Sequence, residues 1–282
     1  MSSSSDTLPL PSYASPPVVE TVLGVQFDRI PGFTNAHLGA FWKTLDPAEW
    51  PTVTDAPALP PQLETFNHAA KLGRSIRFQL TQEPLCRLQI KNAAGDRMLQ
   101  VQNGRLHFNW LASDYPRYEV VREGFVTALR QFIEFVEREG LARIRPNQWE
   151  ITYINQIPQG TVWTTPNDWR FFRPLNSAGA VDDIVQCESF TGEWHFVIPP
   201  ERGRLHIEWQ HGVQASPEQN EREVIGLTLT ARGPFETATP GTDEILGGLD
   251  LGRATIVRTF ASSMSPSANQ YWGLTNANTS SS

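Results

Sequence analysis

The sequence predicts an α+β protein of two similar halves, each with the order strand, helix, strands, helix and each an antiparallel sheet with helices packed on one face. Stretches of alternating apolar and polar residues predict the strands, and two long stretches with apolar residues three or four positions apart predict the closing helices. The strands that begin at Glu20 and Glu150, and the helices that end at Val136 and Met264, share an offset of about 130 residues. This offset indicates a degenerate duplication.

The first half is predicted to span 16–145, after a polar tail at 1–15 that is rich in Ser and Pro and expected to be disordered. Its opening strand has apolar residues on both faces, which indicates burial on one face and partial cover on the other. The expected elements are, in order, a strand at 18–27, a short helix capped by Thr34 or Asn35, a Pro-rich loop at 47–61, and strands at 75–81, 85–91 and 98–102.

The stretch at 99–137 joins the clearest strand to the clearest helix. Leu106, Phe108 and Trp110 alternate with polar residues and predict a half-buried strand. After Pro116, which suits a first helical position, the apolar period lengthens to three or four residues, and Gly140 suits the end of the helix. The apolar faces of this strand and this helix are therefore expected to pack on each other.

The second half is predicted to span 146–274, followed by a disordered polar tail at 275–282. Three glycines in its last helix weaken the helix and indicate either a kink or close packing against a neighbour. The expected elements are strands at 149–157, 188–198, 204–211 and 224–231, a helical turn at 168–175, and a helix at 243–264 that contains Gly247, Gly248 and Gly252.

The chain has 282 residues and a formal net charge of −7, from 23 basic and 30 acidic side chains. An acidic total argues against nucleic-acid binding, which needs basic residues to dominate some surface. No apolar run approaches the length of a membrane span, and the Ser-rich start lacks the features of a secretory signal. The two cysteines, Cys86 and Cys187, fit a reducing compartment. We expect a soluble, cytoplasmic protein without a membrane partner.

Several short motifs along the chain resemble those of a sporadically distributed bacterial family of uncharacterised proteins of similar length, which open with a Pro-Pro-apolar-x-Glu strand. The resemblance covers nearly all of the chain expected to be ordered. It implies the fold and no settled activity, and it suggests an accessory role such as antitoxin, immunity or phage defence. The motifs are Pro16-Pro17-Val18-Val19-Glu20, Val25-Gln26-Phe27, Leu99-Gln100-Val101-Gln102, Phe108-Asn109-Trp110, Tyr115-Pro116-Arg117-Tyr118, Leu249-Asp250 and Ala268-Asn269-Gln270-Tyr271-Trp272-Gly273.

The polar residues around the strand-to-helix corner form the first candidate site. Arg105, His107 and Asn109 share one strand face, and Tyr115 and Arg117 follow at the corner. Asn, Tyr and Arg are residue types that recognise partners. The structural alternative is that they bond the turn backbone and fix the start of the helix.

A second candidate is the strand that carries His206 and Glu208 on one face. Metal binding needs converging ligands, and no His-x-His or His-Glu-x-x-His motif occurs, so solvated strand faces are the simpler interpretation. The chain also lacks a Gly-x-Ser-x-Gly elbow and a phosphate-binding loop. We therefore predict no cofactor, no metal and no catalytic residue.

Trp163 and Trp194 fall at loops or element ends, where indole rings can be partly exposed and can serve an interface. The alternative is that they belong to the core. The leading functional hypothesis is a non-enzymatic binding or adaptor protein that recognises a protein partner through its sheet face and aromatic loops. The alternative is a small-ligand-binding protein or enzyme with a pocket between the sheet and the long helix. Nucleic-acid binding would need an arginine cluster on one sheet face.

Overall fold

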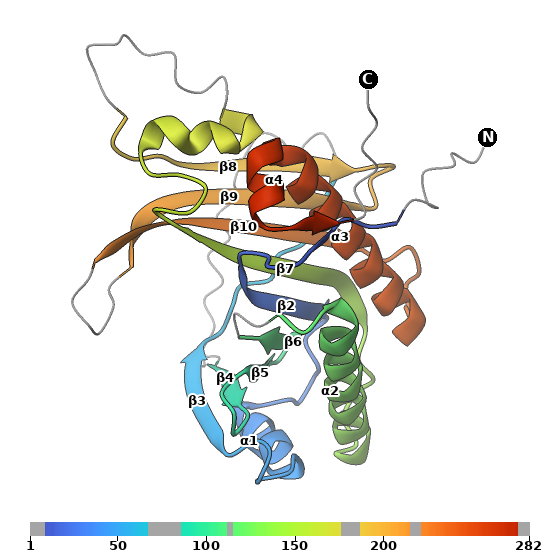
Figure 1. Ribbon diagram of the computed structural model, residues 1–282. Helices are drawn as coiled ribbons and strands as arrows, with labels where there is room; N and C mark the ends of the chain where they lie inside the picture. The colour runs from blue at the N-terminus through green and yellow to red at the C-terminus, as the bar shows by residue number, and fades with distance from the viewer. Residues whose placement is uncertain (1–8, 67–85, 112–114, 176–186, 215–220, 276–282) are drawn as a thin grey trace.

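The computed structural model describes residues 9–66, 86–111, 115–175, 187–214 and 221–275. The predicted α+β class, with helices packed against an antiparallel sheet, is confirmed (Figure 1). Residues up to Arg138 form β1 (Ser12–Tyr13), β2 (Val18–Phe27), α1 (Asn35–Thr44), β3 (Thr52–Pro57), β4 (Cys86–Lys91), β5 (Arg97–Gln102), β6 (Arg105–Trp110) and α2 (Tyr118–Arg138). The rest form β7 (Pro146–Pro158), the 3-10 helices η3 (Pro166–Phe171) and η4 (Arg173–Leu175), β8 (Thr191–Ile198), β9 (Gly203–Gln214), β10 (Arg222–Pro234), α3 (Thr242–Ser263), α4 (Pro266–Tyr271) and β11 (Leu274–Thr275).

Nine strands form one continuous sheet in the order β3-β4-β5-β6-β2-β7-β10-β9-β8. The first strands of the two predicted halves, β2 and β7, pair antiparallel at its centre, with Leu23 opposite Ile151. Each of them pairs on its other side with the strand that precedes the long helix of its own half, β6 or β10. The halves therefore share one sheet, while their origin by duplication stays a prediction.

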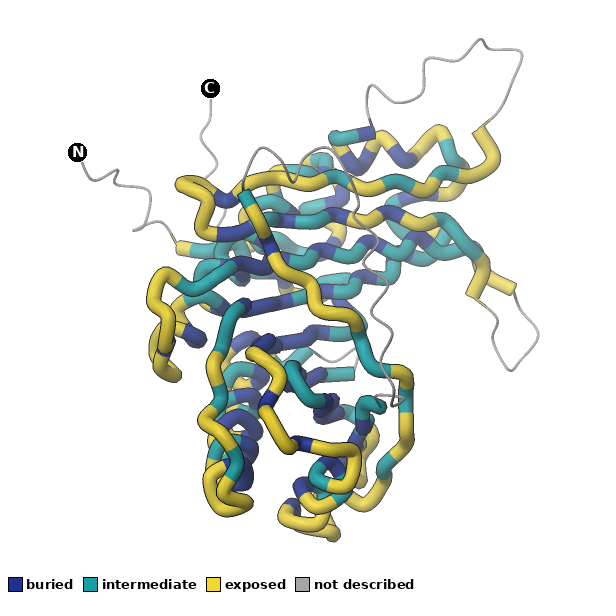
Figure 2. The backbone as a smooth tube through the Cα atoms, turned by 180° about the vertical axis from the view of Figure 1, so that it is seen from behind, coloured by how far each residue is buried: buried dark blue, intermediate teal, exposed yellow. Residues whose placement is uncertain are grey.

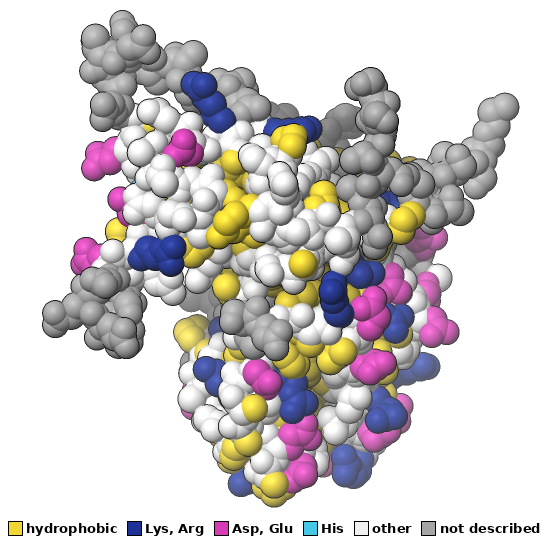
Figure 3. Space-filling view, viewed as in Figure 1, with side chains coloured by type: hydrophobic (Ala, Val, Ile, Leu, Met, Phe, Trp, Pro, Cys, Tyr) yellow, Lys and Arg dark blue, Asp and Glu magenta, His cyan; other side chains and the backbone are white. Residues whose placement is uncertain are grey.

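The core lies between the sheet and the helices, all on one face. The predicted contact between β6 and α2 is confirmed: Phe108 and Phe125 are both buried, and Gly124 of α2 leaves room for the Phe108 ring. Close packing explains two of the three glycines of α3, whereas a Cβ at Gly247 would meet nothing within 4 Å. A Cβ at Gly248 would lie 2.4 Å from the Trp149 ring, and one at Gly252 would lie 2.4 Å from Cγ2 of Ile151. The outer side of α2 and α3 carries charges of both signs (Figure 3).

Four boundaries differ from the sequence prediction. The tail predicted to be disordered at 1–15 contains β1, which pairs with β11, and the Tyr13 hydroxyl donates to Oδ1 of Asn269 at 2.7 Å. The predicted loop at 47–61 contains β3, whose pairing with β4 overrides its proline content. The long helix begins at Tyr118 rather than Pro116, because Arg117 has a positive φ of 85°. The last helix begins at Thr242, directly after its N-cap residue Gly241, and ends at Ser263 rather than spanning 243–264.

Some predicted segments fall outside the described residues, namely the strand at 75–81 and the outer parts of both tails, 1–8 and 276–282. Within the described ranges, no helix has both the length and the apolar character that crossing a membrane requires.

Candidate functional site

The sheet face turned away from the helices is polar and largely buried. Alternation along each strand sends apolar side chains to the helices and polar ones to this face. A buried polar group without a hydrogen-bond partner destabilises the fold. We therefore expect the polar side chains of this face to be hydrogen-bonded within the protein. Its side chains that are at most 9% exposed are Gln26, Gln100, Gln102, Arg105, His107, Asn109, Gln148, Glu150 and Arg232.

An extended segment, residues 59–66, crosses this face and is called the strap here (Figure 2). Glutamine side chains of the sheet bind its backbone. Gln102 accepts from the N–H of Leu59 and donates to its carbonyl, both at 2.8 Å. Gln26 does the same at Gln62, both at 2.9 Å. An amide side chain can make both bonds because it has one acceptor and one donor group, like a peptide unit.

These glutamines belong to one row of residues in register across four neighbouring strands. Gln102 lies opposite Arg105, which lies opposite Gln26, which lies opposite Gln148. Gln148 accepts from the N–H of Glu64 at 3.1 Å. The strap therefore runs across the strands and is held by a different strand at each step.

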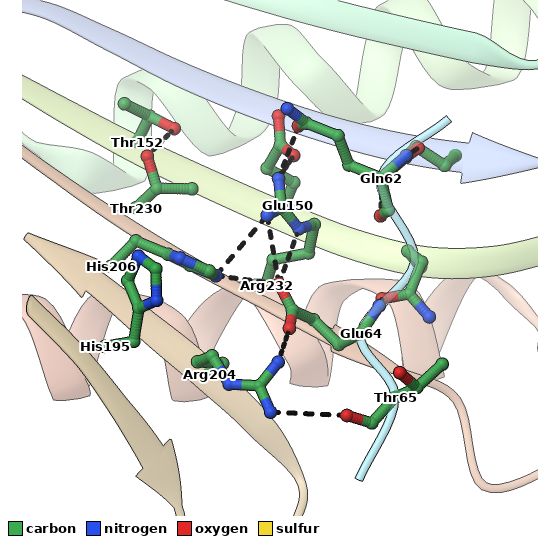
Figure 4. A network of polar contacts seen from close by, with 12 residues as sticks. Gln62, Glu64, Thr65, Glu150, Thr152, His195, Arg204, His206, Thr230 and Arg232 are labelled. Carbon is green, nitrogen blue, oxygen red and sulfur yellow. Dashed lines mark hydrogen bonds and ion pairs between the residues drawn. The ribbon is translucent and has the colours of Figure 1, made fainter. Parts of the chain in front are cut away.

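The strap ends on a carboxylate surrounded by cations (Figure 4). Glu64 is bonded by Arg204, by Nε2 of His206 at 2.7 Å and by Nε of Arg232 at 3.0 Å. Burial alone would raise the pKa of Glu64, but the hydrogen bonds and charges of His206 and Arg232 outweigh it and lower the pKa to about 2. The carboxylate is therefore ionised at neutral pH.

Arg232 links this cluster to a second buried carboxylate, because Nη1 donates to Oε2 of Glu150 at 2.8 Å. On the other side of Glu150, Nε2 of His107 lies 3.3 Å from Oε1. His107 reaches Glu150 across β2 because the residue between them in register is Gly24, where a Cβ would lie 2.3 Å from the His107 ring. Burial would raise the pKa of Glu150, but His107, Arg105 and Arg232 lower it more; the pKa of His107 is lowered, chiefly by burial.

The structure brings Arg105, His107, Asn109 and His206 together on the polar face, with Glu208 exposed toward its β8 edge. The expectation of a solvated strand face is wrong for His206, whose side chain is 17% exposed and whose Nε2 bonds Glu64. His107 is fully buried, at 4% exposed. Asn109 donates to Oε1 of Glu20 at 2.6 Å and accepts from Gln100 at 2.9 Å, so it bonds side chains and not the turn backbone that the structural alternative supposed.

Tyr115 and Arg117 lie apart from this set, beside a cavity on the helix face. The prediction of partly exposed indoles is wrong for Trp163, which is 1% exposed and donates from Nε1 to the carbonyl of Ile157 at 2.9 Å. It is buried because η3 brings Trp169 against it, with ring centroids 6.0 Å apart. Trp194 is half-buried, with its ring 5.6 Å from that of Phe172.

Sequence reasoning missed five residues that hold the network together, namely Gln26, Glu64, Glu150, Arg204 and Arg232. Alternation along β7 could have placed Glu150 on this face, whereas nothing in the Pro-rich surroundings of Glu64 signals its role. No group of three or more His, Cys, Asp or Glu side chains in the described ranges is arranged to hold a metal ion.

The two edges of the sheet differ in how they are protected. The β3 edge is short, carries Asp55 and ends in Pro57, features that discourage pairing with another chain. The β8 edge has no proline or lysine, and its adjacent Phe196 and Val197 are 46% and 48% exposed. Among the described residues β8 pairs only with β9.

Comparison with known proteins adds no name to this geometry. No family model matches the chain, and no curated protein matches it either. The resemblance to an uncharacterised bacterial family therefore stays a prediction.

Proposed function

We propose that this protein binds a protein partner by adding an extended strand of the partner to the open edge of β8. The observation that supports this most is the contrast between the two sheet edges, since the β3 strand is shorter and ends in proline, whereas β8 is longer and contains no proline. In an antiparallel pair, alternate residues exchange backbone bonds with the neighbour and the residues between them direct their N–H and C=O groups outward. β8 therefore offers a row of backbone groups for strand addition.

The side chains on β8 define the kind of partner segment that fits. On the helix face, Trp194 and Phe196 offer aromatic contact to every second residue of an added strand. On the polar face, His195 and Glu193 are exposed beside His206 and Glu208. An extended segment that alternates apolar and polar residues would match both faces. The resemblance to the bacterial family would place this binding in an accessory role such as antitoxin, immunity or phage defence.

Replacing Val197 with proline tests this proposal. The carbonyl of Phe190 accepts from the N–H of His211 at 3.2 Å, and the register from there places the N–H of Val197 outward, away from β9. Proline removes that donor without removing a bond to β9, whereas Val197→Thr keeps it. We expect the tagged Val197→Thr chain to capture the partner from host extract, identified by mass spectrometry, and Val197→Pro to capture at least about tenfold less.

The two variants have the same substitution site, so a difference between them reports on the backbone donor. Equal capture of the same protein by both variants, with both folded by circular dichroism, would contradict strand addition at β8.

A further inference from the structure

A cavity of about 80 Å³ lies on the helix face, where residues before β2, the start of α2 and α3 meet the sheet. Its lining includes the apolar side chains of Val18, Leu229, Ile256 and Phe260. A single water needs only about 10–15 Å³ of such space. The cavity is therefore large enough for a short aliphatic group.

Tyrosine hydroxyls contribute polar groups to the same cavity. The hydroxyls of Tyr115 and Tyr153 lie 2.9 Å apart. Burial raises the pKa of Tyr115 to about 12 and that of Tyr153 well above its ordinary value. Both groups are therefore neutral at neutral pH and can donate hydrogen bonds, but they supply no negative charge.

Arg117 lies at the cavity in a backbone conformation that favours glycine. Its φ of 85° and ψ of 153° are costly for a residue with a Cβ, and such conformations cluster at ligand sites. Its Nη1 donates to the hydroxyl of Ser12 at 2.7 Å, and no ion pair between described residues includes it. The guanidinium therefore retains capacity for an anion.

Two further features add positive charge to the opening of the cavity beside Arg117. The start of α2 has no side-chain cap, so that its first N–H groups lack a side-chain acceptor at the positive end of the helix dipole. Arg253 also lines the cavity, where its guanidinium lies 4.7 Å from the Tyr118 ring centroid and its Nη2 lies 3.5 Å from Oε1 of Glu119. An anion here would meet one arginine that has no ion pair among the described residues and one that is weakly paired.

We propose that this cavity binds a short-chain monocarboxylic acid, with the aliphatic end among Val18, Leu229 and Ile256 and the carboxylate at Arg117. The apolar wall selects for the alkyl chain and the positive mouth selects for the charge. A cavity of roughly 150 Å³ holds benzene, so the smaller volume here favours a chain of a few carbons over an aromatic or long-chain acid. This site is independent of strand addition at β8.

A titration of the full chain with sodium butyrate, monitored by heteronuclear NMR, tests the proposal. We expect saturable shifts in residues around the cavity and no saturable response to 1-butanol, which has a similar chain but no charge. Arg117→Gln should weaken butyrate binding by at least about tenfold, since it removes a charge-assisted bond. Arg130→Gln, an exposed arginine on the same helix, should leave binding unchanged.

Arg117→Gly provides a second variant that keeps the backbone conformation without strain, because glycine adopts a positive φ freely. It should lose binding as Arg117→Gln does. The proposal is overturned if butyrate gives no saturable shifts, if 1-butanol binds as well as butyrate, or if both Arg117 variants bind butyrate like the unaltered chain.

Discussion

Replacing Arg232 with methionine is expected to lower the free energy of unfolding by about 3–5 kcal/mol, which is the usual cost of leaving a buried charge without its partner. Arg232 is 9% exposed and bonds both Glu64 and Glu150. Without it, two ionised carboxylates remain close together on the polar face with less compensating charge. Urea unfolding, monitored by tryptophan fluorescence, measures the loss in the free energy of unfolding.

Two companion variants show whether the loss comes from unpaired charge. Arg130→Met changes the same residue type on the exposed face of α2 and is expected to stay within about 0.5 kcal/mol of the unaltered chain. Adding Glu64→Gln to Arg232→Met removes one of the two carboxylate charges and should recover part of the stability. A loss below about 1 kcal/mol for Arg232→Met would show that this network contributes little to the fold.

Gly24→Ala is expected to destabilise the protein by about 1–3 kcal/mol, the usual range for overpacking. The added Cβ would lie 2.3 Å from Cδ2 of His107. The ring has little space to move, because it is 4% exposed and lies against Glu150 on the far side of β2. Thermal or urea unfolding of the variant measures the effect.

The clash with His107 can be isolated by a double-mutant cycle. In a His107→Ala background there is no ring to meet the new Cβ, so Gly24→Ala should become neutral or slightly stabilising, since alanine suits a strand interior better than glycine. The same loss in both backgrounds would place the cause in the backbone of β2 rather than in His107.

The sequence predicted the faces of the central strands well, because alternation is a local property. Arg105, His107 and Asn109 lie on one face of β6. Leu106, Phe108 and Trp110 lie on its other face, as the pattern of that strand indicates. The same holds for His206 and Glu208 on β9. These assignments depend only on residues within a few positions of one another.

The partners of those faces could not be predicted, because they come from distant parts of the chain. Glu64 meets Arg204 across 140 residues of sequence, and its own Pro-rich surroundings have no periodicity. Trp163 is buried by residues of η3 and β9. The single short 3-10 helix η3 leaves no apolar stripe in the sequence that could have indicated this contact. The position of β8 at one end of the sheet, among the residues that the structure describes, follows from the strand order, which no local pattern specifies.

Hydrogen–deuterium exchange on the complex captured through the tagged chain tests strand addition most directly. Adding a strand to β8 supplies acceptors for its outward N–H groups, so amides within Thr191–Ile198 should exchange more slowly in the complex than in the free protein. The amides of β3, at the opposite edge, should be unchanged. Slowed exchange elsewhere in the chain, with β8 the same in both states, would contradict the proposal that the partner binds at this edge.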